Sequence, residues 1–225
     1  MNKNQHIQLP NRKENEDVSP REQLVYLALK SFMNKDTKES FPSLQKISEL
    51  LDISIPTLRK DIKHLEDLDY IKIIKKGKNQ IYRFNDYKTF EVFSYDFLYN
   101  KDLTSTEKAY LVATQQYMFK TQETGSVSFS NNALSNLIHM PESTVSKCNR
   151  SLENKNLLTI VDNRNRDDLG LMAQTKIFKL AEFNEAVVNT LVNHEDRLSQ
   201  LEKQNQLLMA EINRLKGLQQ EEIIL

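Results

Sequence analysis

The chain repeats itself at an offset of 87 residues. Residues 47–74, ISELLDISIPTLRKDIKHLEDLDYIKII, align without a gap with residues 134–161, LSNLIHMPESTVSKCNRSLENKNLLTIV. Apolar residues recur at matching positions of the two copies: Ile47 with Leu134, Leu58 with Val145, and Leu65 with Leu152. A recurring set of core positions indicates a repeated supersecondary unit. A chain of 225 residues allows one large domain or two small ones, and the repeat favours two small domains of one kind.

Each copy carries the signals of three helices and a hairpin. In the first copy, SPRE at 19–22 is a capping box, a second helix follows Ser43, and a third follows its cap Ser54. The stretch YIKIIKKGKNQIYRF, residues 70–84, then predicts a β-hairpin. The second copy opens on another capping box, TSTE at 104–107, and has a long polar loop between its last two strands.

This order of elements resembles winged-helix DNA-binding domains over residues 19–84, and it recurs in the second copy. The resemblance implies a mainly α fold with small β-wings: two winged-helix domains in tandem, followed by a long C-terminal coiled-coil helix. Tandem winged helices recur in replication initiators and transcription regulators of bacteria, their plasmids and their phages. It also implies that the third helix of each unit enters the major groove of DNA.

We predict five segments along the chain. They are a disordered polar arm (1–18), winged-helix domain 1 (19–85), an aromatic-rich linker (86–103), winged-helix domain 2 (104–181) and a C-terminal coiled-coil helix (182–225). The linker holds six aromatic residues and no Gly or Pro. Its aromatics either stack on unpaired bases or pack the junction between the domains. Packing is favoured because large aromatic side chains are usually buried.

Charge is distributed unevenly although the chain is neutral overall, with 31 basic and 31 acidic residues. Residues 54–84 contain 8 basic and 4 acidic residues, and residues 143–180 contain 7 and 4. Residues 181–225 contain only 4 basic residues and 8 acidic ones. A local positive charge on both predicted reading units favours nucleic acid as the partner.

The predicted DNA contacts lie on the third helix and on the wing of each unit. In the first unit they are Thr57, Arg59, Lys60, Lys63, His64, Lys75, Lys76 and Lys78. In the second they are Ser143, Thr144, Ser146, Lys147, Asn149, Arg150, Arg164 and Arg166. Arg and Lys bond guanine edges or phosphates, and Ser, Thr and Asn bond base edges or phosphates. Two arginines in a wing loop also suit a narrow minor groove.

The last forty residues show a heptad repeat. The predicted dimerisation residues are Leu191, Leu198, Leu201, Asn205, Leu208, Ile212 and Leu215. One Asn at an a position favours two parallel strands in register, and Arg197 with Glu202 would attract across the seam. We predict a homodimer through a parallel coiled coil. The alternative is an amphipathic helix that folds back on its own domains.

Other chemistry finds little support. Neither GxxxxGK[ST] nor GxGxxG occurs, and the four histidines share no metal-ligand spacing with Cys148. Asp167–Asp168 is expected to be a solvated carboxylate pair in a loop rather than a metal or acid-base site. Cys148 is expected to be a small buried residue. We therefore predict a protein that is not an enzyme and needs no cofactor or metal. A single cysteine suits the cytoplasm, and no apolar run is long enough for a membrane helix.

The resulting hypothesis is a sequence-specific binder of double-stranded DNA at an origin or operator, acting in replication initiation, copy control or transcription regulation. A replication or transcription protein is a further expected partner. The alternative is an adaptor for segregation, replisome or polymerase recruitment that uses its winged helices for protein docking, because the fold alone does not decide the function.

Overall fold

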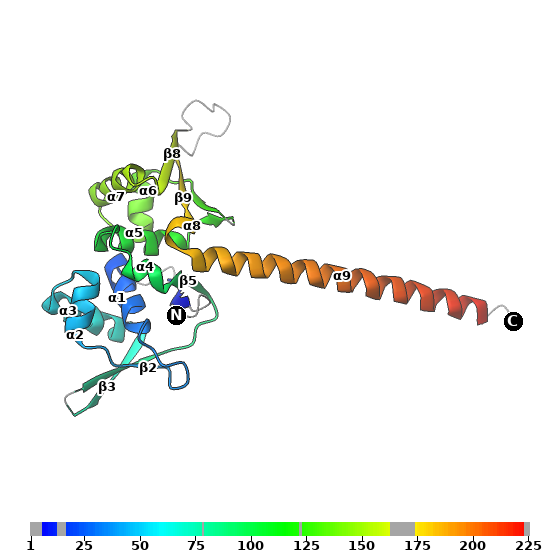
Figure 1. The fold of residues 1–225 in the computed structure, drawn as a ribbon, viewed down its shortest axis with the longest axis horizontal. Helices are drawn as coiled ribbons and strands as arrows, with labels where there is room; N and C mark the ends of the chain where they lie inside the picture. The colour runs from blue at the N-terminus through cyan, green and yellow to red at the C-terminus, as the bar shows by residue number, and fades with distance from the viewer. Residues whose placement is uncertain (1–5, 13–16, 78, 122, 163–173, 223–225) are drawn as a thin grey trace. The chain divides into compact units, whose positions relative to one another are not determined.

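The computed structural model describes residues 6–12, 17–77, 79–121, 123–162 and 174–222 (Figure 1). The fold is mainly helical with small antiparallel sheets, as the sequence predicts. The chain divides into two compact parts, residues 1–188, which contain both helix-plus-wing units, and residues 189–225. In the described part of the chain, no helix combines the length and apolarity that crossing a bilayer requires.

The first helix-plus-wing unit follows the predicted order. It comprises α1 (Pro20–Lys30), β2 (Glu39–Ser40), α2 (Leu44–Leu51), α3 (Ile55–Asp67), β3 (Ile71–Lys76) and β4 (Asn79–Phe84). The strands form one antiparallel sheet in the order β2-β4-β3. Gly77, with φ of 63°, lies in the turn between β3 and β4, where a left-handed backbone suits glycine.

The second unit repeats this plan. It comprises α5 (Ser105–Gln115), β6 (Phe119–Lys120), β7 (Thr124–Val127), α6 (Asn131–Ile138), α7 (Glu142–Asn154), β8 (Leu158–Asp162) and β9 (Gln174–Lys179). Its sheet has the order β6-β7-β9-β8. The predicted duplication of the helix-plus-wing unit is confirmed.

The repeat extends to backbone detail. Helices α2 and α6 have 8 residues each, α3 and α7 have 13 each, and both pairs keep the 87-residue offset. The turn between each pair contains a left-handed residue, Asp52 (φ 50°) or His139 (φ 54°). It is closed by one serine, since Ser48 Oγ donates to Ile53 O and Ser135 Oγ donates to Met140 O, both at 2.7 Å. The two units are therefore conformational copies.

The two units share one core. Their first helices, α1 and α5, pack against each other (Figure 1). Tyr26 on α1 and Tyr110 on α5 are fully buried. Each helix begins with the predicted capping box, Ser19 with Glu22 and Thr104 with Glu107.

The prediction of a disordered arm is wrong for its middle. Strand β1 (His6–Pro10) pairs antiparallel with β5 (Phe90–Ser94). Ile7 and Leu9 are each 2% exposed, so this strand buries its apolar face. The local pattern misleads because a five-residue strand whose partner is some 80 residues away leaves little local signal.

The stretch between the two helix-plus-wing units forms a strand and a short helix. After β5 comes the short helix α4 (Tyr95–Tyr99). Phe93 and Phe97 are buried with their ring centroids 5.3 Å apart, whereas Phe90 and Tyr99 are exposed. Two of the aromatic side chains therefore pack the core and two face solvent.

The chain leaves the second unit through α8 (Leu180–Phe183) and continues as α9 (Glu185–Glu222). Between them, the fully buried Asn184 donates through Nδ2 to Val92 O (2.9 Å) and to Gln115 Oε1 (2.7 Å). Its Oδ1 accepts from the backbone N–H of Ser94 (2.9 Å). These three bonds attach the start of α9 to β5 and α5. Val187, on the first turn of α9, is also buried.

Candidate nucleic-acid interface

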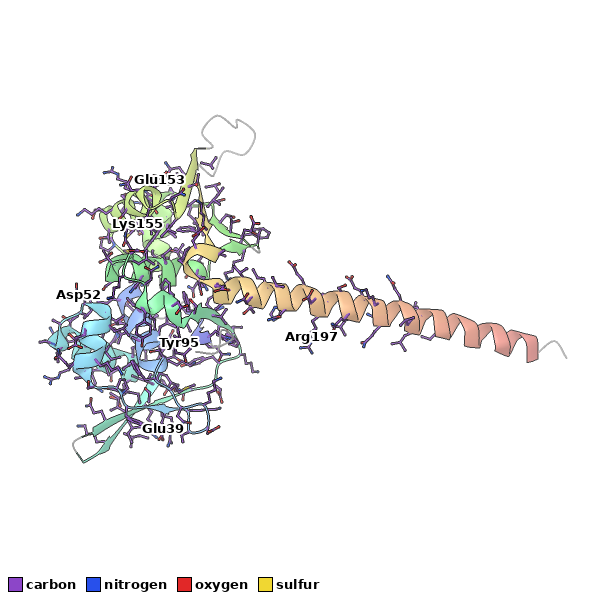
Figure 2. All side chains as sticks on the ribbon, in the orientation of Figure 1. Glu39, Asp52, Tyr95, Glu153, Lys155 and Arg197 are labelled. Atoms are coloured by element: carbon purple, nitrogen blue, oxygen red, sulfur yellow. The ribbon has the colours of Figure 1, made fainter. Side chains whose placement is uncertain are left out.

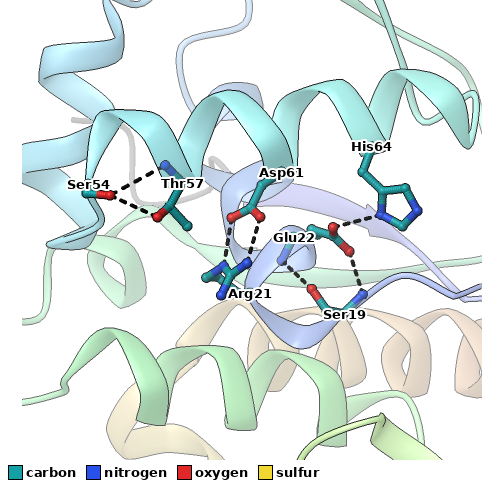
Figure 3. Close-up of polar contacts among 7 residues, drawn as sticks. All are labelled: Ser19, Arg21, Glu22, Ser54, Thr57, Asp61 and His64. Atoms are coloured by element: carbon teal, nitrogen blue, oxygen red, sulfur yellow. Dashed lines mark hydrogen bonds and ion pairs between the residues drawn. The ribbon is translucent and has the colours of Figure 1, made fainter.

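Helix α3 presents one face to the core and the opposite face to solvent. Leu58, Ile62 and Leu65 are buried, as their helical spacing predicts. At its start, Ser54 Oγ accepts from the backbone N–H of Thr57 and bonds the Thr57 hydroxyl (Figure 3). Thr57 is half-buried, and its hydroxyl already has a partner in Ser54.

An ion pair holds α3 against α1. Arg21 donates from Nε and from a terminal nitrogen to the two carboxylate oxygens of Asp61, both at 2.8 Å (Figure 3). The Asp61 side chain is 3% exposed and that of Arg21 is 53% exposed. The bond to Asp61 raises the pKa of Arg21 above its ordinary value. Asp61 therefore has its ion-pair partner on α1 and does not pair with the cations on the outer face of α3.

His64 ties the same two helices together one turn later. Its Nδ1 lies 2.7 Å from Glu22 Oε1, and Glu22 also completes the capping box with Ser19 (Figure 3). Although the sequence places His64 among the DNA contacts, the structure gives it a partner on α1. Its side chain remains 40% exposed.

Arg59 and Lys60 are the exposed cations of α3 that lack a partner among the described residues. Both side chains are exposed, and neither makes a hydrogen bond or ion pair there. Lys63 is also exposed but contacts Asp67 (2.7 Å) and Glu66 (3.2 Å), which raises its pKa. The three predicted Lys and Arg contacts on this helix therefore divide into two unpaired cations and one paired cation.

The first wing is described in part. Lys75, on β3, is exposed. Lys76 ends the same strand, but its side chain lies outside the described residues, as does Lys78 altogether. Arg164 and Arg166 of the second wing also lie outside the described residues.

Helix α7, like α3, has one buried face and one exposed face. Val145, Cys148 and Leu152 are buried, whereas Lys147 and Arg150 are exposed and have no partner among the residues the structure describes. Ser143 is exposed, and Thr144 and Ser146 are half-buried. Burial raises the pKa of Cys148 to about 11, so this thiol stays neutral, in agreement with the predicted role of a small buried residue.

Asn149 requires a correction, because it is 2% exposed and faces the interior. Its Oδ1 accepts from the Tyr110 hydroxyl (2.6 Å), and its Nδ2 donates to Asn131 Oδ1 (3.0 Å). Asn131 in turn donates to Ser146 Oγ (3.1 Å). Asn149 therefore connects α7 to α5 and α6 and does not contact DNA from this position.

Two lysines counted in the local charge of the second unit are also engaged internally. Lys155 Nζ donates to both carboxylate oxygens of Glu107, each at 2.7 Å (Figure 2 labels Lys155). Lys176 is fully buried and donates to Phe129 O (2.7 Å), and this burial lowers its pKa. Of the other cations counted in this unit, Lys147 and Arg150 are exposed and Lys179 is half-buried, whereas Arg164 and Arg166 lie outside the described residues.

Helix α9 carries the predicted dimerisation residues. Leu198, Leu201, Asn205, Leu208 and Ile212 are exposed in the single chain, and Leu191 is half-buried. The side chain of Leu215 lies outside the described residues. Arg197, at a predicted g position, is labelled in Figure 2. An exposed apolar stripe on one helix is the pattern that a coiled-coil partner would cover.

The first unit has relatives among known domains. A family model described as a helix-turn-helix domain matches residues 16–71. This stretch contains a helix-turn-helix domain. Such a domain implies DNA as a partner. Helix α3 is the second helix of its helix-turn-helix motif. No curated protein matches the chain.

Proposed function

We propose that the protein is a non-enzymatic, sequence-specific binder of double-stranded DNA that reads its target with both α3 and α7. One observation carries the proposal. Arg59 and Lys60 on α3, and Lys147 and Arg150 on α7, are exposed cations without a partner among the described residues. Exposed cations on the second helix of a helix-turn-helix motif are placed for base edges and phosphates in the major groove.

Arg59 and Lys60 on α3 would have different roles in DNA binding. Arg59 can donate two hydrogen bonds to O6 and N7 of a guanine, which gives sequence information. Lys60 is a point charge suited to a phosphate, which gives affinity and register. Lys75, on the wing strand β3, extends the phosphate contact beyond the groove.

The biological setting we propose is an operator or an origin of replication. One chain with two reading helices suits an extended site, and a dimer through α9 would bring four reading helices to paired sites. Half-sites on one side of the duplex would be spaced by whole helical turns of about 34 Å.

The decisive experiment measures the affinity of the full chain for double-stranded DNA as a function of salt concentration. For Lys60→Ala and Lys147→Ala, we expect weaker binding and a plot of log affinity against log salt that is shallower by about 0.9 per lost phosphate contact. Lys35→Ala, an exposed lysine in the loop between α1 and β2, is the matched control and should change neither quantity. Equal loss in all three variants, or no salt-dependent binding at all, would overturn the proposal.

A further inference from the structure

The two reading helices can be compared position by position, because α3 and α7 have equal length and keep a constant offset. Three positions carry similar side chains in both units: Thr57 with Thr144, Lys60 with Lys147, and Lys63 with Arg150. Lys63 is paired with Asp67 and Glu66, whereas Arg150 is unpaired among the described residues. The exposed Pro56 and Ser143 differ, as do the half-buried His64 and Ser151. The largest difference in reach and charge is at Arg59 of α3, which corresponds to Ser146 of α7.

The difference at this position is one of reach as well as charge. Arg59 is exposed and makes no bond to another described residue, so its guanidinium is available. Ser146 is half-buried, and its Oγ accepts a hydrogen bond from Asn131 Nδ2 at 3.1 Å. A serine side chain also ends near the helix, whereas an arginine extends to the base edges.

The supporting contacts differ in the same way between the units. Behind α3, the ion pair of Arg21 with Asp61 fixes the helix and leaves the outer face untouched. Behind α7, the Tyr110–Asn149–Asn131 chain of hydrogen bonds ends on Ser146 itself. The second unit therefore uses this position to hold its reading helix in place.

The geometry points to two related but unequal half-sites for one chain. Both halves share the contacts of the common Thr and Lys positions. At the place read from the Arg59/Ser146 position, a guanine is selected only in the half read by α3, by Arg59. The base pair at the matching place in the half read by α7 is not selected, because Ser146 does not reach it. This inference rests on the proposed function and makes Arg59 the residue that distinguishes the two halves.

The test selects duplexes from a random DNA library with the full chain and sequences the bound fraction. For the unaltered chain, we expect two similar blocks, of which one shows a guanine preference of about tenfold or more. Arg59→Ser should abolish that preference and leave the second block unchanged. Ser146→Arg should create the same preference at the matching place of the second block, and the double variant should exchange the two patterns.

Two controls keep the outcomes distinct. Ser146→Met lengthens the side chain without adding a guanidinium and should create no guanine preference in the second block. If Ser146→Arg fails to fold, as thermal unfolding will show, Arg59→Ser still tests the inference alone. Selected DNA with an unaltered guanine preference in Arg59→Ser would overturn the inference and leave the proposed function standing. No enrichment of any DNA by the unaltered chain would overturn both.

Discussion

Neighbouring residues on α7 have opposite surroundings. Asn149 is buried and bonded to Tyr110 and Asn131, whereas Arg150 is exposed and unpaired among the described residues. A buried polar group that loses its partner costs far more than an exposed one, because water cannot replace the bond. Substitutions at Asn149 should therefore change the stability of the protein, whereas substitutions at Arg150 should change the proposed DNA binding.

For Asn149→Ala we expect a loss of about 2 to 3 kcal/mol in the free energy of unfolding, since the Tyr110 hydroxyl and the Asn131 side chain both lose a partner. For Arg150→Ala we expect a change within about 0.5 kcal/mol together with weaker DNA binding. Urea denaturation and binding assays on the two variants check this. Equal stability of the two variants would show that the Asn149 network is unimportant.

The sequence contains a signal for Asn149 that residue type alone conceals. Asn149 aligns with Ile62 at the 87-residue offset, and Ile62 is a core residue of α3. The alignment thus points inward, but Asn is a common base-contacting residue, and its type favours the opposite interpretation. His64 is comparable: its partner Glu22 lies 42 residues earlier, a distance at which local patterns carry no information.

At the scale of elements, the first helix of each unit holds the reading helix in place. In the first unit, Arg21 and Glu22 of α1 bond Asp61 and His64 of α3. In the second unit, Glu107 of α5 bonds Lys155 at the end of α7. The capping glutamate of each first helix therefore bonds both within its own helix and to the reading helix of the same unit or the residue that ends it.

The ion pair of Arg21 with Asp61 should respond unequally to removal of its partners. Arg21→Ala leaves a buried carboxylate without its partner, and we expect a loss of about 2 to 3 kcal/mol in the free energy of unfolding. Asp61→Ala leaves an arginine that is half exposed and can be hydrated, so the loss should be smaller. Guanidinium denaturation of both variants makes the comparison. A larger loss for Asp61→Ala would contradict it.

The Glu107 carboxyl predicts a pH dependence. Burial alone would raise its pKa, but bonds from Lys155, Ser151 and Thr104 outweigh burial and hold the pKa below the ordinary 4.5. A lowered pKa in the folded state means stability that is present above pH 4.5 and lost as the pH falls through the folded value. Glu107→Gln should therefore be less stable than the unaltered chain at neutral pH, by about 2 kcal/mol.

This difference should shrink as the pH is lowered below 4.5, because the unaltered carboxyl then becomes protonated too. Denaturation curves of both proteins across that range provide the measurement. Lys35→Ala serves as a control, since it changes an exposed charge and should keep a constant difference from the unaltered chain. A Glu107→Gln deficit that persists unchanged at acidic pH would contradict the argument.

At the scale of the whole molecule, local patterns predicted the duplicated elements well, and long-range pairing was the part they missed. The predicted start of α3 at its cap Ser54 agrees with the structure, because caps and apolar spacing act within a few residues. Strand β1 was missed because its partner β5 is distant in the chain. The burial of Lys176, which the charge sum counted as available, also depends on contacts that no local pattern records.

Helix α9 carries the prediction for assembly. If Asn205 lies at an a position of a parallel dimer, Asn205→Leu should raise the thermal stability and broaden the choice of oligomer, because a buried Asn costs stability and fixes register. Leu201→Asn, the matched change at a d position, should weaken the dimer. Sedimentation over a range of concentrations measures both. A strict dimer in Asn205→Leu, with unaltered stability, would count against this register.

The packing of α1 against α5 places both reading helices on a single core. Two reading helices held on one core do not rotate freely about the axis of a duplex. Each base pair added between the half-sites turns one half-site relative to the other by about 34°. The chain would therefore act as a gauge of helical phase: a target lengthened by a few base pairs between its halves presents the second half on the wrong side, however well each half matches.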